Sequence, residues 1–185
     1  MGELLAALHN RAKQWPALAG CALIAAFALA FALVGQLAWH WRPCPWCIVQ
    51  RIAYVLIGIT GLIGTASMRL RQAEPAVGRW SVALPAVFVV VLAFLGAAAA
   101  AWQSFGPVAS SGCALTLADR LVAASGLDVL LPLLFAATAN CDEANIPLMG
   151  VPFGIWSLMV FILIALLAAL AVRAPQIASS RTPSP

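Results

Sequence analysis

Charged residues are scarce in this chain: ten lysines and arginines and six aspartates and glutamates make up only 9% of its 185 residues. The net charge of +4 is too sparse and too scattered for a nucleic-acid-binding surface, so no nucleic-acid partner is expected. Apolar residues make up 64% of the chain, whereas soluble domains contain roughly half. Because the apolar excess lies in long runs, the composition excludes an ordinary soluble domain and indicates an integral membrane protein.

Four apolar runs are long enough to cross a bilayer, because about 20 helical residues cover a hydrocarbon core of about 30 Å. The first run is too long for the apolar part of a signal peptide and lacks a small-x-small cleavage site before Arg42, so we interpret it as a retained span. The predicted segments are spans at about 17–39, 47–67, 82–102 and 152–172, outer loops at 40–46 and 103–151, and a disordered tail at 173–185.

Two parts of the second outer loop, 115–124 and 129–139, have helical patterns but are too short to cross a membrane. We expect them to lie along the membrane interface. The predicted fold is therefore all-α: a single integral-membrane domain over residues 1–185, built as a four-transmembrane-helix bundle with a short interfacial helix or two in the second outer loop.

The basic residues are unevenly divided between the two sides of this predicted bundle. Two lie on the side of the outer loops, Arg42 and Arg120, with Arg51 near the membrane boundary. Seven lie on the side of the termini: Arg11, Lys13, Arg69, Arg71, Arg79, Arg173 and Arg181. Cytoplasmic loops carry the excess of lysine and arginine, so both termini are predicted to be cytoplasmic. Cysteines in the outer loops then face a compartment in which disulfides persist.

The stretch Cys44-Pro45-Trp46-Cys47 opens the second predicted span. Proline is favoured in the first turn of a helix, so both cysteines are expected at a helix N-terminus, where the helix dipole stabilises a reactive thiolate. Arg51 follows Cys47 by four residues, so the two share a helix face and the guanidinium can approach the sulfur. An arginine just inside a membrane boundary is costly and points to a function.

The other cysteines allow several kinds of site. Zinc would require two closely spaced pairs, but Cys113 and Cys141 lie 28 residues apart, so no metal is expected. A haem attachment site would need histidine where Ile48 stands. Inert disulfides are a third possibility, although a CxxC pair closes a small ring and constrains little of the chain. Cys21 lies alone in the first span, and we interpret it as a small buried apolar residue.

A redox relay is the remaining possibility. One cysteine pair would exchange disulfides with a soluble protein, and the pair fixed at the membrane would pass electrons to a lipid-soluble carrier. The stretch CPWCIVQR at residues 44–51, the four spans and the second pair in the last outer loop resemble the DsbB family of membrane disulfide-generating quinone reductases. The segments Leu131-Pro132…Phe135 before Cys141 and Gly150…Pro152 before Trp156 extend this resemblance to about residues 15–172.

The resemblance implies an enzyme of the bacterial inner membrane whose active site faces the periplasm. It implies that Cys113 is attacked by a reduced DsbA-like thioredoxin-fold oxidase and that Cys141 pairs transiently with Cys44. Cys47 would then be released as a thiolate against a bound quinone, either ubiquinone or menaquinone. Arg51 would stabilise that thiolate and the charge that develops on the quinone. The expected partners are this oxidase, membrane lipid and the quinone pool, and no oligomer is expected.

The chain also departs from the family at one place. Many members carry histidine or a basic residue near the outer end of the third span, where this chain has Ala97–Ala101 followed by Trp102 and Gln103. The quinone site is therefore expected to be completed differently, with Trp102 and Gln103 as candidates between which the sequence does not decide. We interpret His40 as a solvated residue at the boundary and Gln36 as a packing residue.

Two rival functions are considered. Vitamin-K-epoxide-reductase-like proteins also combine four helices, cysteine pairs and a quinone, but their quinone-side CxxC lies on the last span. The other rival is a non-catalytic membrane protein with structural disulfides, which would keep its activity without its cysteines.

Overall fold

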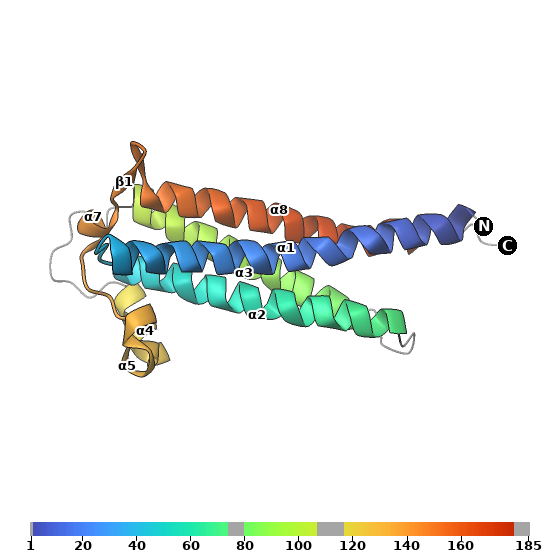
Figure 1. Cartoon of the computed structure of the whole chain (residues 1–185), viewed down its shortest axis with the longest axis horizontal. Coiled ribbons are helices and arrows are strands. Elements are labelled where there is room, and N and C mark those ends of the chain that lie inside the picture. The colour runs from blue at the N-terminus through green and yellow to red at the C-terminus, as the bar shows by residue number, and fades with distance from the viewer. Residues whose placement is uncertain (1, 74–79, 107–116, 180–185) are drawn as a thin grey trace.

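The computed structural model describes residues 2–73, 80–106 and 117–179, and in this part of the chain four long helices run side by side (Figure 1). Each contains an apolar stretch of 19 to 26 residues that is long enough to cross a membrane: Ala17–Ala38, Pro45–Leu70, Ala83–Phe105 and Phe153–Ala171. The helices are α1 (Gly2–Ala38), α2 (Pro45–Ala73), α3 (Trp80–Phe105) and α8 (Phe153–Ser179). The chain is therefore a multi-pass membrane protein with a four-helix bundle, as predicted.

Two of the helices extend beyond their predicted spans. α1 begins at Gly2, and α8 continues to Ser179, so the prediction of a disordered tail is wrong for residues 173–179. Lengthening an existing helix avoids the cost of a new nucleus, and it continues here past Pro175. Residues 180–185 lie outside the described part of the chain. α1 starts and α8 ends at the same end of the bundle (Figure 1).

The bundle is closed, because α1 packs on α2, α2 on α3, α3 on α8, and α8 on α1. Small residues bring α2 close to its neighbours away from the CxxC stretch. A Cβ atom added at Gly61 would lie 3.0 Å from the carbonyl oxygen of Leu18, and one at Gly64 would lie 3.0 Å from the Cβ of Pro85. Glycine therefore permits this contact, as in other membrane helix pairs.

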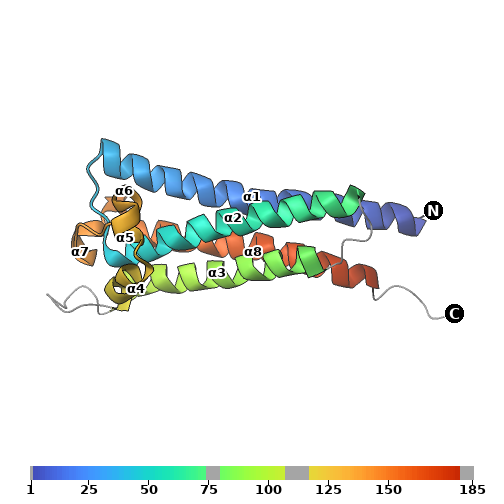
Figure 2. The ribbon, with the colours of Figure 1, turned by 90° about the horizontal axis from the view of Figure 1, so that it is seen from below.

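Short elements between α3 and α8 gather at one end of the bundle, which we call the loop end (Figure 2). They are α4 (Leu117–Ser125), α5 (Leu127–Leu130), α6 (Pro132–Phe135), α7 (Cys141–Ala144) and an antiparallel hairpin of β1 (Pro147–Leu148) and β2 (Val151–Pro152). Met149 and Gly150 form the hairpin turn with φ values of 53° and 81°. This pair of positive φ angles is typical of a two-residue type I′ turn.

The prediction of one helix over 129–139 is wrong. Leu131 precedes a proline and adopts φ −135° and ψ 67°, which separates α5 from α6. The helical structure then ends at Phe135, and α7 and the hairpin were not predicted. The first predicted short helix, 115–124, corresponds to α4, although residues 115 and 116 lie outside the described part.

α4 and α6 are anchored on α2 through a buried apolar cluster of Ile48, Val122 and Phe135. α5, which lies between them, leaves large apolar side chains exposed: Val129 at 81% and Leu130 at 74%. Such side chains are what a position along the membrane interface requires. That position stays a prediction.

Candidate redox site

The CxxC stretch lies where α2 begins. Pro45 is the first residue of the helix, and the carbonyl oxygen of Cys44 accepts a hydrogen bond from the amide of Ile48 at 3.1 Å. Cys44 is thus the N-cap residue and Cys47 lies in the first turn, as the sequence predicts. Both are free thiols, and their sulfurs lie 3.2 Å apart. The pair is therefore close enough to open and close reversibly with little backbone movement.

Cys141 is brought to this pair by the segment between α6 and α7. The amides of Thr138 and Ala139 donate hydrogen bonds of 2.9 and 3.2 Å to the carbonyl oxygen of Pro43. α7 begins two residues later and brings Cys141 close enough to Cys44 for each thiol to shift the pKa of the other. Cys44 also hydrogen-bonds with Cys47, so it interacts with both of the other cysteines.

Cys44 and Cys141 differ in how readily their thiols lose a proton. Hydrogen bonds with Cys141 and Cys47, together with complete burial of the side chain, raise the pKa of Cys44. The hydrogen bond with Cys44 lowers the pKa of Cys141, against an opposing effect of burial. Cys44 therefore keeps the proton, and Cys141 has more of the reactive thiolate form than an ordinary cysteine.

The fourth predicted cysteine, Cys113, lies in residues 107–116, outside the described part of the chain. The structure thus brings together three of the four predicted redox cysteines. Cys21 lies apart from them: it is buried in α1, and its thiol contacts the carbonyl oxygen of Ile164 on α8 at 3.7 Å. This agrees with its interpretation as a small buried residue.

Two buried glutamines form a hydrogen-bonded pair next to the Cys47 sulfur. Nε2 of Gln103, on α3, donates to the Cys47 sulfur at 3.3 Å, and Oε1 of Gln103 accepts a 2.6 Å hydrogen bond from Nε2 of Gln50. The side chains of Gln50 and Gln103 are only 4% and 6% exposed. The sequence analysis named Gln103 because it lies at the outer end of the third span, but it predicted no contact with Cys47. It assigned no role to Gln50.

Arg51 is buried, but its hydrogen bonds are not made to the Cys47 sulfur that the sequence analysis expected it to approach. Nη1 donates to Oε1 of Gln36 on α1 at 2.7 Å and to the carbonyl oxygen of Leu134 at 2.9 Å. In the described residues Arg51 makes no hydrogen bond to Cys47, on which it acts through its charge. Gln36, interpreted as a packing residue, is thus a hydrogen-bond partner of Arg51.

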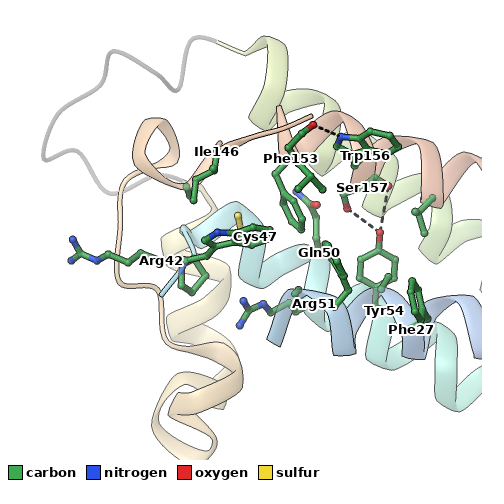
Figure 3. A pocket seen from close by; sticks show the side chains of 18 of the residues that line it. Phe27, Arg42, Cys47, Gln50, Arg51, Tyr54, Ile146, Phe153, Trp156 and Ser157 are labelled. Carbon is green, nitrogen blue, oxygen red and sulfur yellow. Dashed lines mark hydrogen bonds between the residues drawn. The ribbon is translucent and has the colours of Figure 1, made fainter. Parts of the chain in front are cut away.

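A cavity of about 290 Å³ opens beside Cys47 and Arg51 (Figure 3). α2 contributes Cys47, Gln50, Arg51 and Tyr54, which are spaced so that they share one face of the helix. Apolar and aromatic side chains form most of the remaining walls, contributed mainly by α1 and α8: Ile24, Phe27, Phe31, Phe153, Trp156 and Val160. A cavity with apolar walls and a few polar groups is typical of a small-molecule site.

Tyr54 and Ser157 provide a second polar position in this cavity, further from the CxxC stretch (Figure 3). The Tyr54 hydroxyl lies 2.9 Å from the hydroxyl of Ser157 on α8. Its ring stacks on Phe161, with centroids 4.2 Å apart and planes within 5°. The sequence analysis missed Tyr54, although its spacing of seven residues from Cys47 was a usable signal.

Two residues considered from the sequence lie away from the cavity. His40 is exposed, with φ 55°, and is not among the cavity-lining residues, which fits its interpretation as a solvated residue. Trp102 is half exposed and packs near Trp46, with ring centroids 6.5 Å apart. Of the candidates at the outer end of α3, Gln103 is the one that contacts a cysteine.

Comparison with known proteins gives a consistent result. A family model described as "Disulfide bond formation protein DsbB" matches residues 13–171. A Disulfide bond formation protein B of Dechloromonas aromatica is 32% identical over 152 residues, covering 80% of this chain and 85% of that protein. A protein of the same name from Nitrosomonas europaea is 31% identical over 162 residues, covering 86% and 93%. The Disulfide bond formation protein B 1 of Pseudomonas fluorescens is 32% identical over 142 residues, covering 75% and 78%.

Proposed function

Because the chain belongs to the DsbB family of disulfide bond formation proteins, we propose that it reoxidises a DsbA-like thioredoxin-fold oxidase and passes the electrons to a membrane quinone. The observation that carries this proposal is the position of the CxxC pair between two different surroundings. Cys44 contacts the thiol of Cys141, whereas Cys47 lines an apolar cavity among membrane-spanning helices. The pair therefore connects a loop cysteine with a space suited to a lipid-soluble molecule.

The residues that line the cavity fit a quinone. A quinone ring is flat and apolar except for carbonyl oxygens that accept hydrogen bonds, and when bound it accepts two electrons and two protons. Aromatic side chains such as Phe31 and Phe153 match the ring, and Arg51 and Tyr54 carry N–H and O–H donors at two depths of the cavity. Ubiquinone and menaquinone share this chemistry, so both are covered by the proposal.

The order of the sulfurs supports one direction of disulfide exchange. The Cys141 thiolate attacks the Cys44 sulfur of a Cys44–Cys47 disulfide, so that the Cys44–Cys141 bond forms and Cys47 leaves as a thiolate. The contact between Cys141 and Cys44 and the lowered pKa of Cys141 favour this attack. Cys47 is then released at the cavity wall.

Arg51 is the buried charged group of the cavity, whose lining also includes the exposed Arg42. A guanidinium stays protonated inside proteins, so Arg51 stabilises negative charge at the cavity without giving up a proton. Its two hydrogen bonds, to Gln36 and to the Leu134 carbonyl, fix the guanidinium in place. Fixed donors stabilise developing charge without reorganising at the moment of reaction.

The proposed location is the bacterial inner membrane, with the loop end facing the periplasm. The excess of basic residues on the side of the termini supports this orientation. Cys113 is proposed to accept the attack of the soluble oxidase. Trapping a mixed disulfide with an oxidase variant that lacks its second cysteine, followed by mapping of the linked residue, tests this assignment.

The function itself is tested with the purified full-length chain, a reduced DsbA-like oxidase and a water-soluble quinone analogue. We expect one quinone reduced per dithiol oxidised, no turnover with Cys47→Ser, and normal turnover with Cys21→Ala as the matched control. Absence of quinone reduction by the wild-type chain would refute the proposal. Activity that survives replacement of Cys44, Cys47, Cys113 and Cys141 together would indicate a non-catalytic membrane protein instead.

A further inference from the structure

We propose that Gln103, oriented by Gln50, is a positioning residue that holds the Cys47 sulfur in its thiolate form. The inference rests on the proposed function, in which Cys47 is the sulfur released toward the cavity. The hydrogen bonds on which it rests involve no ligand, because they lie on the side of Cys47 that faces α3. Gln103 is not among the cavity-lining residues, so it contacts the sulfur from outside the cavity.

The direction of the hydrogen bonds carries the argument. An amide side chain has a donor end and an acceptor end. The Gln50 Nε2 group donates to Oε1 of Gln103 at 2.6 Å, which leaves Nε2 of Gln103 directed at the Cys47 sulfur at 3.3 Å. In this arrangement the sulfur is the acceptor, and a thiolate accepts a hydrogen bond better than a neutral thiol does. The opposite arrangement, with both amides reversed, would suit a protonated thiol.

The second step concerns what remains beside Cys47 after disulfide exchange. Within the described residues its sulfur has two hydrogen-bond partners, Cys44 and Gln103. Once Cys44 is bonded to Cys141 it has no S–H group to donate. Arg51 makes its hydrogen bonds to Gln36 and the Leu134 carbonyl. Gln103 is therefore the side chain that keeps donating to the released thiolate, beside the backbone amide of Cys44, and a buried charge without donors is costly.

The test measures the reactivity of Cys47 in the reduced, quinone-free full-length chain, purified in detergent. The protein is treated with short pulses of iodoacetamide, and alkylation of Cys47 is quantified by peptide mass spectrometry. Because hydrogen bonds to charged groups are among the strong ones, we expect Gln103→Met to slow Cys47 alkylation about tenfold at neutral pH. The rate should recover at alkaline pH, a change that altered packing alone does not produce.

Gln50→Met provides the second arm, because Gln50 does not touch the sulfur. It should cause a smaller loss of rate, by leaving the Gln103 amide free to turn. The double variant should be no slower than Gln103→Met alone, since the two residues act through one hydrogen bond to the sulfur. Ser104→Ala is the matched control, because the hydrogen bond that this neighbouring side chain makes within the described residues goes to the Ala100 carbonyl of its own helix.

Two results would overturn the inference: a wild-type rate and pH profile in Gln103→Met, or fully additive losses in the double variant. If Gln103→Met does not fold, Gln50→Met alone decides, because a wild-type rate there is incompatible with an orienting role. None of these measurements uses quinone or a partner protein. A failure of the inference about Gln50 and Gln103 is therefore distinguishable from a failure of the proposed function. The latter would appear as a lack of turnover by the wild-type chain.

Discussion

Cys44 and Cys47 lie three residues apart on one helix and have opposite surroundings. Cys44 is fully buried, contacts Cys141 and has a raised pKa. Cys47 is half-buried, lines the cavity and accepts a hydrogen bond from Gln103. The difference shows how a symmetric motif acquires a direction: one sulfur keeps the proton and faces the loop cysteine Cys141, and the other faces the space where electrons leave.

The two surroundings are also built differently. The Cys44 side consists of loop elements, held by the backbone hydrogen bonds of Thr138 and Ala139 to Pro43 and by an exposed ion pair of 3.7 Å between Arg42 and Glu143. Such surface ion pairs contribute little. The Cys47 side consists mainly of packed membrane helices, although residues outside them, such as Pro43 and Ile146, also line the cavity. The exchange side is thus formed by loop elements and the cavity side mainly by the bundle.

The largest expected effect comes from removing either sulfur of the pair. Cys44→Ser and Cys47→Ser should both abolish turnover, but only Cys47→Ser retains a Cys44 thiol that can form a disulfide with Cys141, the disulfide of an oxidised partner accepting the two electrons. A disulfide between Cys44 and Cys141 should therefore accumulate in Cys47→Ser after reaction with an oxidised partner, and mass spectrometry of non-reduced peptides detects it. Equal behaviour of the two variants would remove the proposed difference between the two sulfurs.

The next effect concerns the charge on the cavity side. Arg51→Ala should lower kcat/KM for a quinone analogue about a hundredfold, the size typical of losing a preorganised donor to developing charge. Formation of the mixed disulfide with the partner should continue, because Arg51 contacts neither Cys44 nor Cys141 through a hydrogen bond in the described structure. Arg51→Lys should recover part of the loss. Unchanged quinone kinetics in Arg51→Ala would refute this role.

A pH profile sharpens the comparison on the loop side. The pKa of Cys141 is lowered, so its thiolate, and with it its alkylation, should persist below the usual cysteine pKa of about 8.5. The pKa of Cys44 is raised, so alkylation of Cys44 requires more alkaline solution. Cys44→Ala removes the hydrogen bond that lowers the pKa of Cys141 and should move the Cys141 profile to higher pH. The measurement is residue-resolved alkylation across pH, and coincident profiles for Cys44 and Cys141 would contradict the assignment.

The smallest effect is expected deep in the cavity. Tyr54→Phe keeps the stack on Phe161 and loses the hydrogen bond to Ser157, which should reduce the free energy of unfolding by about 1 kcal/mol. It should also raise KM for the quinone analogue a few-fold without slowing disulfide exchange. Thr65→Val is the matched control on α2, because its hydroxyl bonds only the Gly61 carbonyl and lies outside the cavity. A KM change of the same size in both variants would exclude a role for Tyr54 in binding.

The features that the sequence predicted correctly depend on neighbouring residues. Run length determines the four spans, and Pro45 marks the first turn of α2, so the positions of Cys44 and Cys47 followed from local rules. The contact of Gln103 with Cys47 joins residues 56 positions apart and depends on how α3 is rotated against α2. Periodicity within one helix does not determine that rotation, which is why the glutamine pair was missed.

Arg51 illustrates the limit of a local argument. Its four-residue spacing from Cys47 correctly placed both side chains on one face of α2. The sequence could not show that Gln36 and the Leu134 carbonyl, from α1 and α6, would offer oxygen acceptors closer to the guanidinium. Cys141 interacts with Cys44 in the structure, and the transient disulfide between them that the family resemblance implied stays a prediction. The role of Cys113 stays a prediction.

One wall of the cavity has a consequence for how the site is supplied. Phe27 lines the cavity and is also 73% exposed on the surface of a membrane-spanning segment of α1. A molecule dissolved in the hydrocarbon therefore meets this wall from the side and never has to cross water. Its availability is set by its mole fraction among the lipids, so apparent affinities measured in detergent or in vesicles should scale with the amount of amphiphile present and not with the volume of the sample.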